Sequence, residues 1–163
     1  MRHAGLIWTT TSRGQEMFKH ILIPTDGSPV SAKAIKAGVK MATQTGARVT
    51  GYCAIEPPQM HIRGASYELD PKLQAALDRS ARKAASRHVV AIGRAARAAG
   101  IKFDLLVTES PAPYAGIIDT ARTRKCDVIF MASHGRRGIG ALIMGSTTNK
   151  VLTHSKIPVL VYR

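Results

Sequence analysis

Apolar residues along this chain form five short runs, separated by stretches in which apolar positions recur at helical spacing. Short runs with β-branched side chains are typical of strands, and positions repeating every three to four residues are typical of helices. The predicted strands are Lys19–Thr25, Arg48–Ile55, Lys102–Thr108, Asp127–Ala132 and Pro158–Tyr162. The predicted helices are Val30–Thr45, Pro71 to near Gly100, Tyr114–Arg124 and Ser146–Ser155. Between them, Glu56–Asp70 has two prolines and a glycine and predicts an irregular excursion.

Strands and helices alternate in this order, and the alternation decides the fold class. A helix between every two strands requires a mostly parallel sheet with helices on both faces, so the sequence predicts an open α/β fold with five strands. Ligands of such sheets bind beyond the carboxyl ends of the strands, where the strand order changes direction. If the first and fourth strands are neighbours, Asp26 and the loop after the fourth strand border one crevice.

The loop after the fourth predicted strand carries the clearest candidate chemistry. The buried run Val128–Met131 is followed by a loop with four glycines and then by hydroxyl residues where a helix begins. The glycines are Gly135, Gly138, Gly140 and Gly145, and the hydroxyl residues that could cap the helix are Ser146, Thr147 and Thr148. Backbone N–H groups in such a loop and at a helix start hold phosphate. The alternative is a flexible connection without a ligand.

Four side chains near these loops are further candidates, each with a simpler alternative. Asp26 could hold ribose hydroxyls or a base, or it could form the turn before Gly27. His134, Arg136 and Arg137 could contact phosphate, or they could belong to a strand end and a solvated loop tip. No G-x-G-x-x-G follows the first strand and no G-x-x-x-x-G-K-[ST] occurs, which disfavours a dinucleotide fingerprint and a P-loop ATPase.

Length and composition limit the class of protein. The chain has 163 residues, of which 45% are hydrophobic, enough for one domain with a sizeable core. No apolar run approaches the roughly 20 residues that span a bilayer, so no membrane association is expected. Residues 1–16 lack a secretory h-region and are expected to be a flexible extension before a domain at 17–163. Cys53 and Cys126 show no metal-like spacing, no metal site is expected, and a reducing cytoplasm fits.

The chain is strongly basic, with a net charge of +14, which raises the question of an anionic partner. Much of the excess lies on and just after the predicted long helix, in Lys72, Arg79, Arg82, Lys83, Arg87, Arg94, Arg97 and Lys102. Aromatic residues make up 5% of the chain, and none stands among these charges to stack on bases. The sequence therefore favours a solvated helix face over a nucleic-acid partner. His88, on the apolar side of that helix, is expected to be a core or dimer-face residue.

Residues 17–163 resemble the universal stress protein family over essentially their whole length. Three stretches carry the resemblance: KHILIPTDGS at Lys19–Ser28, the motif G-x2-G-x9-G-[ST] at 132–146, and VLTHSKIPVLVY at Val151–Tyr162. The resemblance implies a Rossmann-like nucleotide-binding fold with strand order 3-2-1-4-5 and a homodimer in which Pro158–Tyr162 pairs with its symmetry mate.

The resemblance also implies a set of nucleotide-binding residues. In members that bind ATP, the Asp after the first strand holds the nucleoside side and the loop after the fourth strand holds the phosphates. Carried over by position, the set is Pro24, Thr25, Asp26, Ala54, Met131, Ala132, His134, Gly135, Gly145, Ser146 and Thr147. Ala54 would line the adenine pocket, and the two glycines with Ser146 and Thr147 would hold phosphate.

Ala132 departs from the family motif, which has glycine there, and it is tolerated if its φ is negative. The expected function is a cytoplasmic stress-response protein that binds ATP, with or without Mg²⁺, as a regulatory ligand. No catalytic residue is expected, because the chain shows no Walker lysine, no base to orient water and no acidic pair for Mg²⁺, so hydrolysis would be slow at most. The alternative, which Ala132 favours, is a nucleotide-independent dimeric interaction or holdase-like protein. An adenylyl-transferring enzyme would carry S-G-G-x-D-S or H-I-G-H, and neither occurs.

Overall fold

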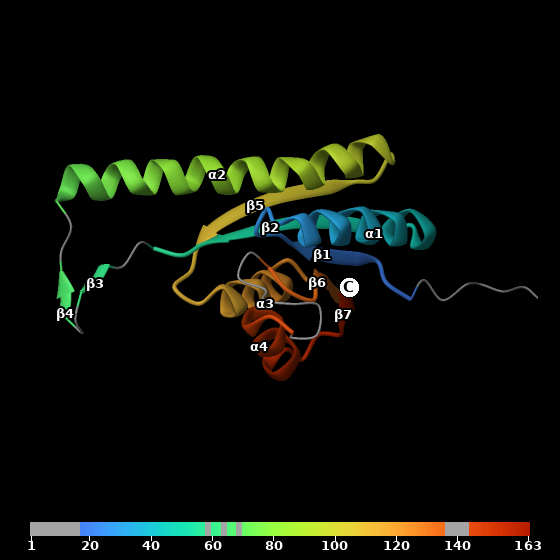
Figure 1. Cartoon of the computed structure of the whole chain (residues 1–163). Helices are drawn as coiled ribbons and strands as arrows, with labels where there is room; N and C mark the ends of the chain where they lie inside the picture. Colours follow the sequence, from blue (N-terminus) through green and yellow to red (C-terminus); the bar gives the residue numbers. More distant parts are fainter. Residues whose placement is uncertain (1–16, 58–59, 63–64, 68–69, 136–143) are drawn as a thin grey trace, which may run out of the picture.

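A five-stranded parallel sheet forms the centre of the molecule (Figure 1). The computed structural model describes residues 17–57, 60–62, 65–67, 70–135 and 144–163. The strands of this sheet are β1 (His20–Pro24), β2 (Arg48–Ile55), β5 (Phe103–Glu109), β6 (Val128–Ala132) and β7 (Val159–Tyr162). They lie in the order β5-β2-β1-β6-β7, and every pairing is parallel. Counted along the chain, this order is 3-2-1-4-5, so the predicted fold class and strand order are confirmed.

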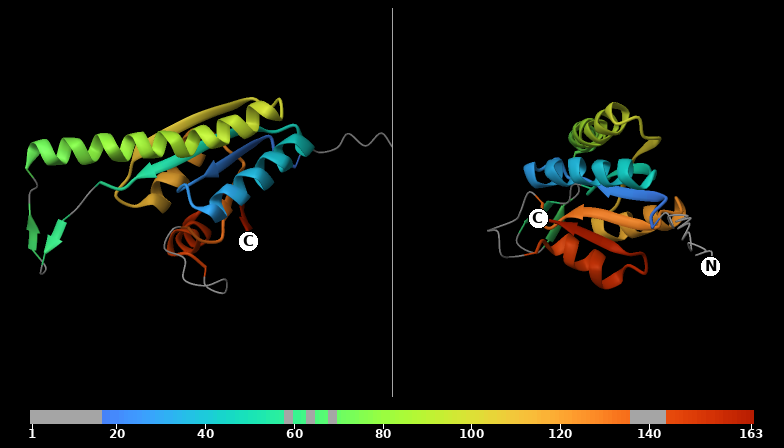
Figure 2. Two further views of the ribbon diagram at one scale, coloured as in Figure 1. Left: turned by 45° about the horizontal axis from the view of Figure 1, so that its top comes forward. Right: turned by 90° about the vertical axis from the view of Figure 1, so that its right-hand side faces the viewer.

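Two helices cover each face of the sheet. The helices α1 (Pro29–Thr45) and α2 (Pro71–Ala98) pack against each other on one face, and α3 (Pro113–Thr123) and α4 (Ser146–His154) pack on the other, as two further views show (Figure 2). The first half of α2 projects beyond the sheet (Figure 1). The predicted arrangement with helices on both faces is therefore confirmed.

The ends of α1 follow from local sequence chemistry. Ser28 caps the helix by accepting a hydrogen bond from the Ser31 amide at 3.2 Å, and Pro29 takes the first helical position. At the other end Gly46 adopts a φ of 71°, a conformation that ends a helix and costs glycine little. These residues fix where α1 begins, directly after the turn that follows β1.

The core consists of apolar layers on the two faces of the sheet. On the α1 side, Ile21, Ile23 and Phe130 pack with residues of α1 and with Ile92 of α2. On the α3 side, Leu22 and Ile129 pack with residues of α3 and α4 in a second cluster. All residues of β1 and β6 are buried, which is usual for the central strands of a doubly covered parallel sheet.

Two sequence predictions about local structure are wrong. The segment Glu56–Asp70 includes a short antiparallel pair, β3 (Met60–Ile62) with β4 (Ala65–Tyr67), because the two strands are separated by only two residues, the spacing of a tight hairpin. The hydroxyl residues expected to cap α4 lie inside the helix, which begins at Ser146, so the N-cap is Gly145, which has no side chain to form a cap bond. The Thr148 hydroxyl donates to the backbone oxygen of Ala132 at 3.0 Å. Residues 1–16, the predicted flexible extension, lie outside the described residues.

Neither cysteine forms a disulfide, and both are buried in the sheet region. Cys53 lies on β2 beneath α2, and Cys126 lies just before β6. Burial raises the pKa of the Cys126 thiol to about 11, so its reactive thiolate form is rare at neutral pH. Among the helices that the structure describes, none combines the length and apolarity needed to cross a membrane.

The buried His20 predicts a pH dependence of stability. His20 lies on β1 and shares a hydrogen bond of 2.7 Å with the Thr50 hydroxyl, and burial, reinforced by the nearby Arg48, lowers the pKa of its imidazole. As pH falls, the His20 side chain of the unfolded chain is protonated at a higher pH than that of the folded chain. The contribution of neutral His20 to folding stability is therefore fully present above pH 6.5 and is lost as pH falls through the folded pKa. We expect the unfolding midpoint in urea to decrease between pH 7.5 and 5.5, and to decrease less in His20→Asn. The exposed His154 serves as control, since His154→Asn should keep the dependence of the urea midpoint on pH that the parent chain shows. The same dependence in His20→Asn would contradict the assignment of this effect to His20.

Candidate functional site

The loops after β1 and β6 meet at the carboxyl edge of the sheet. The two strands are direct neighbours, with Ile21 opposite Val128 and Leu22 opposite Ile129. Asp26 follows β1, and its Oδ1 accepts a hydrogen bond from the Ser28 amide at 3.0 Å. A methyl group in place of the Gly135 hydrogen would lie 2.3 Å from Asp26 Oδ2, so the carboxylate rests directly on this glycine. The structure thus brings together Asp26 and Gly135, the first glycine after β6, although they are far apart in the sequence.

The turn that carries Asp26 is held by its neighbours. The Thr25 amide donates to the backbone oxygen of Tyr52 at 2.8 Å, and the Thr25 hydroxyl is 2.7 Å from the Ser31 hydroxyl oxygen. The same Thr25 oxygen accepts a hydrogen bond from the Gly27 amide at 3.1 Å. Because the Thr25 side chain is buried in these contacts, its visible role is to fix the turn and thereby the direction of the Asp26 carboxylate.

His88 of α2, which the sequence analysis expected in the core or at a dimer face, packs on this turn, a contact that the sequence did not predict. Gly27 has a φ of 79°, and a methyl group there would lie 2.3 Å from His88 Nε2. On its other side, His88 Nδ1 is 4.0 Å from Cys53 Sγ. The helical spacing places His88 on the inner side of α2, but it gives no sign of which loop the ring meets. The imidazole therefore buttresses the Asp26 turn from the α2 side.

The two ends of the glycine loop are joined by backbone contacts. The Gly145 amide donates to the backbone oxygen of Ser133 at 2.8 Å, and a methyl group on Gly145 would lie 3.1 Å from the Cα of His134. Such close approach favours glycine at this position. The first turn of α4 follows immediately, and its N-cap Gly145 supplies no side chain, so N–H groups and partial positive charge of the helix start face outward as they do at anion sites. The predicted residues Arg136, Arg137, Gly138 and Gly140 lie outside the described residues.

Ala132 is accommodated without backbone strain. Among the described residues other than glycine, only Lys125 has a positive φ, so the Ala132 backbone is one that alanine adopts readily. Its methyl group is buried in the apolar layer on the α1 side, with Ile21 and Phe130. The departure from the family motif therefore does not strain this turn.

The remaining predicted residues lie around the same edge. Pro24 is buried at the end of β1, and Ala54 and Met131 belong to the apolar layer on the α3 side. His134 is half-buried, with Nδ1 3.0 Å from the Ser133 hydroxyl oxygen. Ser146 is exposed and Thr147 half-buried in the first turn of α4.

The arrangement can bind an anion and, beside it, a group with hydroxyls. Glycine contacts and an uncapped helix start suit phosphate, and the fixed Asp26 carboxylate suits hydroxyl donors such as those of a ribose. Among the described residues no three His, Cys, Asp or Glu side chains gather as they would around a metal ion.

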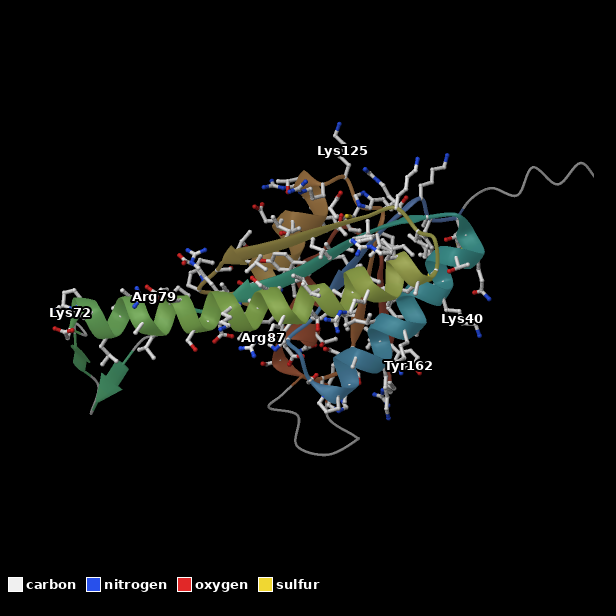
Figure 3. All side chains as sticks on the ribbon, turned by 90° about the horizontal axis from the view of Figure 1, so that it is seen from above. Lys40, Lys72, Arg79, Arg87, Lys125 and Tyr162 are labelled. Atoms are coloured by element: carbon white, nitrogen blue, oxygen red, sulfur yellow. The ribbon has the colours of Figure 1, made fainter. Side chains whose placement is uncertain are left out.

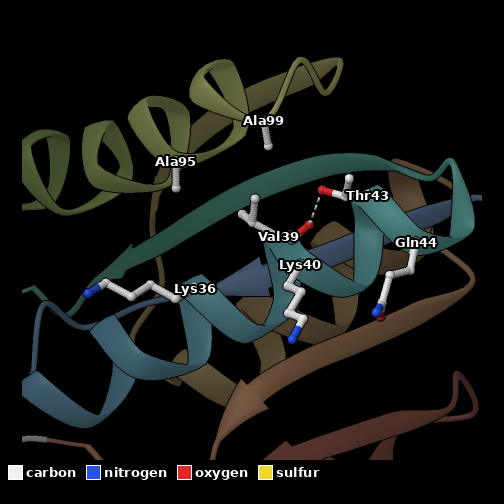
Figure 4. Close-up of a pocket in the computed structure, with 7 residues that line it drawn as sticks. All are labelled: Lys36, Val39, Lys40, Thr43, Gln44, Ala95 and Ala99. Carbon is white, nitrogen blue, oxygen red and sulfur yellow. Dashed lines mark hydrogen bonds between the residues drawn. The ribbon is translucent and has the colours of Figure 1, made fainter.

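A groove of about 520 Å³ lies elsewhere, between α1 and α2 (Figure 4). Its lining comes from Lys36, Val39, Lys40, Thr43 and Gln44 of α1 and from Ala95 and Ala99 at the end of α2. None of these residues belongs to the predicted nucleotide site, and the groove is open to solvent. The chemistry at the carboxyl edge therefore remains the better candidate for a small ligand.

Comparison with known proteins identifies relatives along most of the chain. The model of the universal stress protein family matches residues 17–163. A universal stress protein from Methanocaldococcus jannaschii is 28% identical over 152 residues, covering 92% of this chain and 85% of that protein. One from Thermus aquaticus is 29% identical over 147 residues, covering 90% of this chain and 100% of that protein.

Solved structures share the fold. The universal stress protein UspA from Lactobacillus plantarum superposes with a TM-score of 0.73 at 21% identity, covering 89% of this chain and 97% of that chain. Two structures with bound nucleotide are similar in fold: one from Archaeoglobus fulgidus in complex with dAMP, with a TM-score of 0.61 at 14% identity, and one from Arabidopsis thaliana with AMP bound, with a TM-score of 0.61 at 12% identity. They cover 90% and 88% of this chain and 99% and 90% of their own chains. With the family model matched from residue 17 to the last residue, this chain belongs to the universal stress protein family.

Proposed function

We propose that this chain binds ATP at the carboxyl edge of its sheet as a regulatory ligand in the stress response, with little or no hydrolysis. The observation that carries the proposal is the contact between Asp26 and Gly135, which places a hydroxyl-binding carboxylate beside a phosphate-type loop. Family members of the same fold have dAMP and AMP bound, which supports an adenine nucleotide as the ligand class.

Each part of the nucleotide has a group of this chain to meet it. Asp26 would accept hydrogen bonds from ribose hydroxyls, and Ala54 with Met131 would offer apolar surface to the adenine. Gly135, Gly145 and the first turn of α4 would face the phosphates with backbone N–H groups. Mg²⁺, if bound, would be held mainly by the phosphate oxygens, because ATP-bound Mg²⁺ needs only one or two protein carboxylates.

The lack of a catalytic arrangement supports a regulatory use of the nucleotide. The sequence has no Walker lysine to clamp the β and γ phosphates. The sequence also shows no acidic pair that would hold Mg²⁺ in a hydrolytic site. Binding would then change which partner or conformation the protein favours.

The proposed setting is the cytoplasm and the proposed assembly a homodimer. Neither cysteine forms a disulfide, as is usual in a reducing compartment. Within the part of the chain that the structure describes, the outer edge of β7 pairs with no strand, and Leu160 is 37% exposed there. Pairing of Pro158–Tyr162 with the same strand of a second copy would satisfy that edge.

Removal of the Asp26 carboxylate tests the nucleoside side of the site. We expect the purified chain to release adenine nucleotide when denatured, as measured by mass spectrometry, and to bind ATP in calorimetry. Asp26→Ala should lower the affinity for ATP by about tenfold or more, since hydrogen bonds to a charged group are each worth roughly 1.5–3 kcal/mol. Asp119→Ala, which removes an exposed carboxylate on α3, should leave the affinity unchanged.

Two results would overturn the proposal. No released nucleotide together with no thermal shift in millimolar ATP would support the nucleotide-independent interaction protein instead. Normal ATP affinity in Asp26→Ala would remove Asp26 from the site.

A further inference from the structure

We propose that the solvent-facing side of α2 binds the phosphate backbone of nucleic acid without reading its sequence. Six cations carry the proposal. At 100° per residue, Lys72, Arg79, Lys83, Arg87, Arg94 and Arg97 fall within an arc of about 80° around the helix axis. We call these six residues the basic ridge.

The basic ridge is continuous and exposed. All six side chains are exposed, and Lys72, Arg79 and Arg87 follow one another along α2 in the view from above (Figure 3). The same arc contains two other residues, Ala76 and Val90, and no acid. From Lys72 to Arg97 the ridge is about 37 Å long, close to one turn of duplex DNA at about 34–36 Å.

The charge is concentrated on one face of the molecule. The helices α1 and α2 together carry ten Lys or Arg residues and one acid, Asp78. The helices of the opposite face, α3 and α4, carry two Lys or Arg residues and one acid. Lys33, Lys36 and Lys40 of α1 are exposed on the same face as the basic ridge. The excess is therefore a local field rather than an evenly spread charge.

The acids that the structure describes do not neutralise the basic ridge. No carboxylate among the described residues forms an ion pair with any of the six cations. Arg82, which points elsewhere on α2, pairs with Glu109 of β5. A helix surface that serves only for solubility usually mixes both signs, because like charges along a helix repel. The unmixed ridge thus suits a linear polyanion.

The composition of the ridge favours nucleic acid over other polyanionic partners. A protein interface needs apolar or aromatic anchors, and a membrane-surface helix needs an apolar side to insert; Val90 is the one large apolar residue in this arc. Phosphate contacts need only Lys and Arg. The scarcity of aromatic residues disfavours stacking on bases, but contacts to the phosphate backbone do not require such stacking.

Binding to a fluorescent 20-base-pair duplex of arbitrary sequence, measured by anisotropy with the full chain and no ATP, tests the proposal. We expect binding at 50 mM salt that weakens steeply at 200 mM. The variant Arg79→Gln, Lys83→Gln, Arg87→Gln should bind at least about tenfold more weakly, and the slope of log affinity against log salt should become shallower by about two to three. These residues lie outside the proposed nucleotide site, so ATP binding should not change.

A matched control changes the same number of charges elsewhere. Arg124→Gln, Lys150→Gln, Lys156→Gln removes three exposed cations from other parts of the surface and should retain most of the duplex binding. No duplex binding at 50 mM salt would overturn the proposal, and so would equal losses in the two triple variants, which would indicate net charge alone. A competition experiment gives a further test. If polyglutamate displaces the labelled duplex as well as an unlabelled duplex of equal charge does, the proposal is overturned, because the basic ridge would then suit an acidic protein equally well.

Discussion

Gly135→Ala is expected to weaken ATP binding at least about tenfold while leaving the free energy of unfolding nearly unchanged. The added methyl group would lie 2.3 Å from Asp26 Oδ2, which is too close, so the carboxylate must rotate away. The rotation gives up the hydrogen bond from the Ser28 amide to Asp26 Oδ1 but leaves the apolar core in place, so most of the folding free energy is kept. The Gly135 backbone is one that alanine can adopt because its φ is not positive. The displaced group, however, is the one proposed to hold the ribose. Calorimetric titration with ATP and urea unfolding measure the two quantities separately.

Gly46→Ala provides the opposite pattern as a control. Gly46 ends α1 with a φ of 71° and has no heavy atom within 4 Å of an added methyl group. Alanine there should cost about 1 kcal/mol of stability through backbone strain, without a change in ATP affinity. If Gly135→Ala lowers stability and leaves ATP binding intact, the phosphate-loop assignment is wrong.

Gly27→Ala is expected to destabilise the chain by about 2 kcal/mol or more. Two effects add at this position: the φ of 79° disfavours any side chain, and three atoms of the His88 ring lie within 2.6 Å of the added methyl group. The His88 ring, the turn or α2 must shift to relieve the overlap. Urea unfolding measures the loss, and ATP titration should show weaker binding because Asp26 is the preceding residue.

A double-mutant cycle separates the two effects at Gly27. His88→Ala removes the ring that collides with the new methyl group and leaves only the backbone strain. The double variant Gly27→Ala, His88→Ala should therefore be less destabilised than the sum of the single variants, by about 1 kcal/mol. Strict additivity would mean that the His88 ring does not press on this turn.

The fold could be predicted because its determinants are local and repeated. Each strand is a short apolar run, and each connection contains a helix, so the parallel α/β class follows from the pattern alone. The pairing of β1 with β6 does not follow from this local pattern. It was predicted from the family resemblance, which implies the strand order. The β3 and β4 hairpin was missed because three-residue strands are too short to show a period.

The candidate site was predictable where backbone geometry decides it. Asp26 and the glycines stand at strand ends, and parallel topology then brings them to one edge. The contact of His88 with Gly27 depends on how α2 lies across the sheet, which residue spacing within the helix does not encode. The capping role expected of Ser146 or its neighbours was wrong because α4 already begins at Ser146, which leaves Gly145 as the N-cap, and the Thr148 hydroxyl instead ties the first turn of the helix to the Ala132 carbonyl.

The burial of both cysteines has a practical consequence for studying motion in this protein. Cys53 and Cys126 are 4% and 5% exposed, and they are the only thiols in the sequence. A maleimide dye or spin label should therefore leave the parent chain unmodified and attach selectively to a cysteine introduced at an exposed position such as Gln44 or Ser86. Distances between two such labels could then report how α2 responds to nucleotide without first removing a native cysteine.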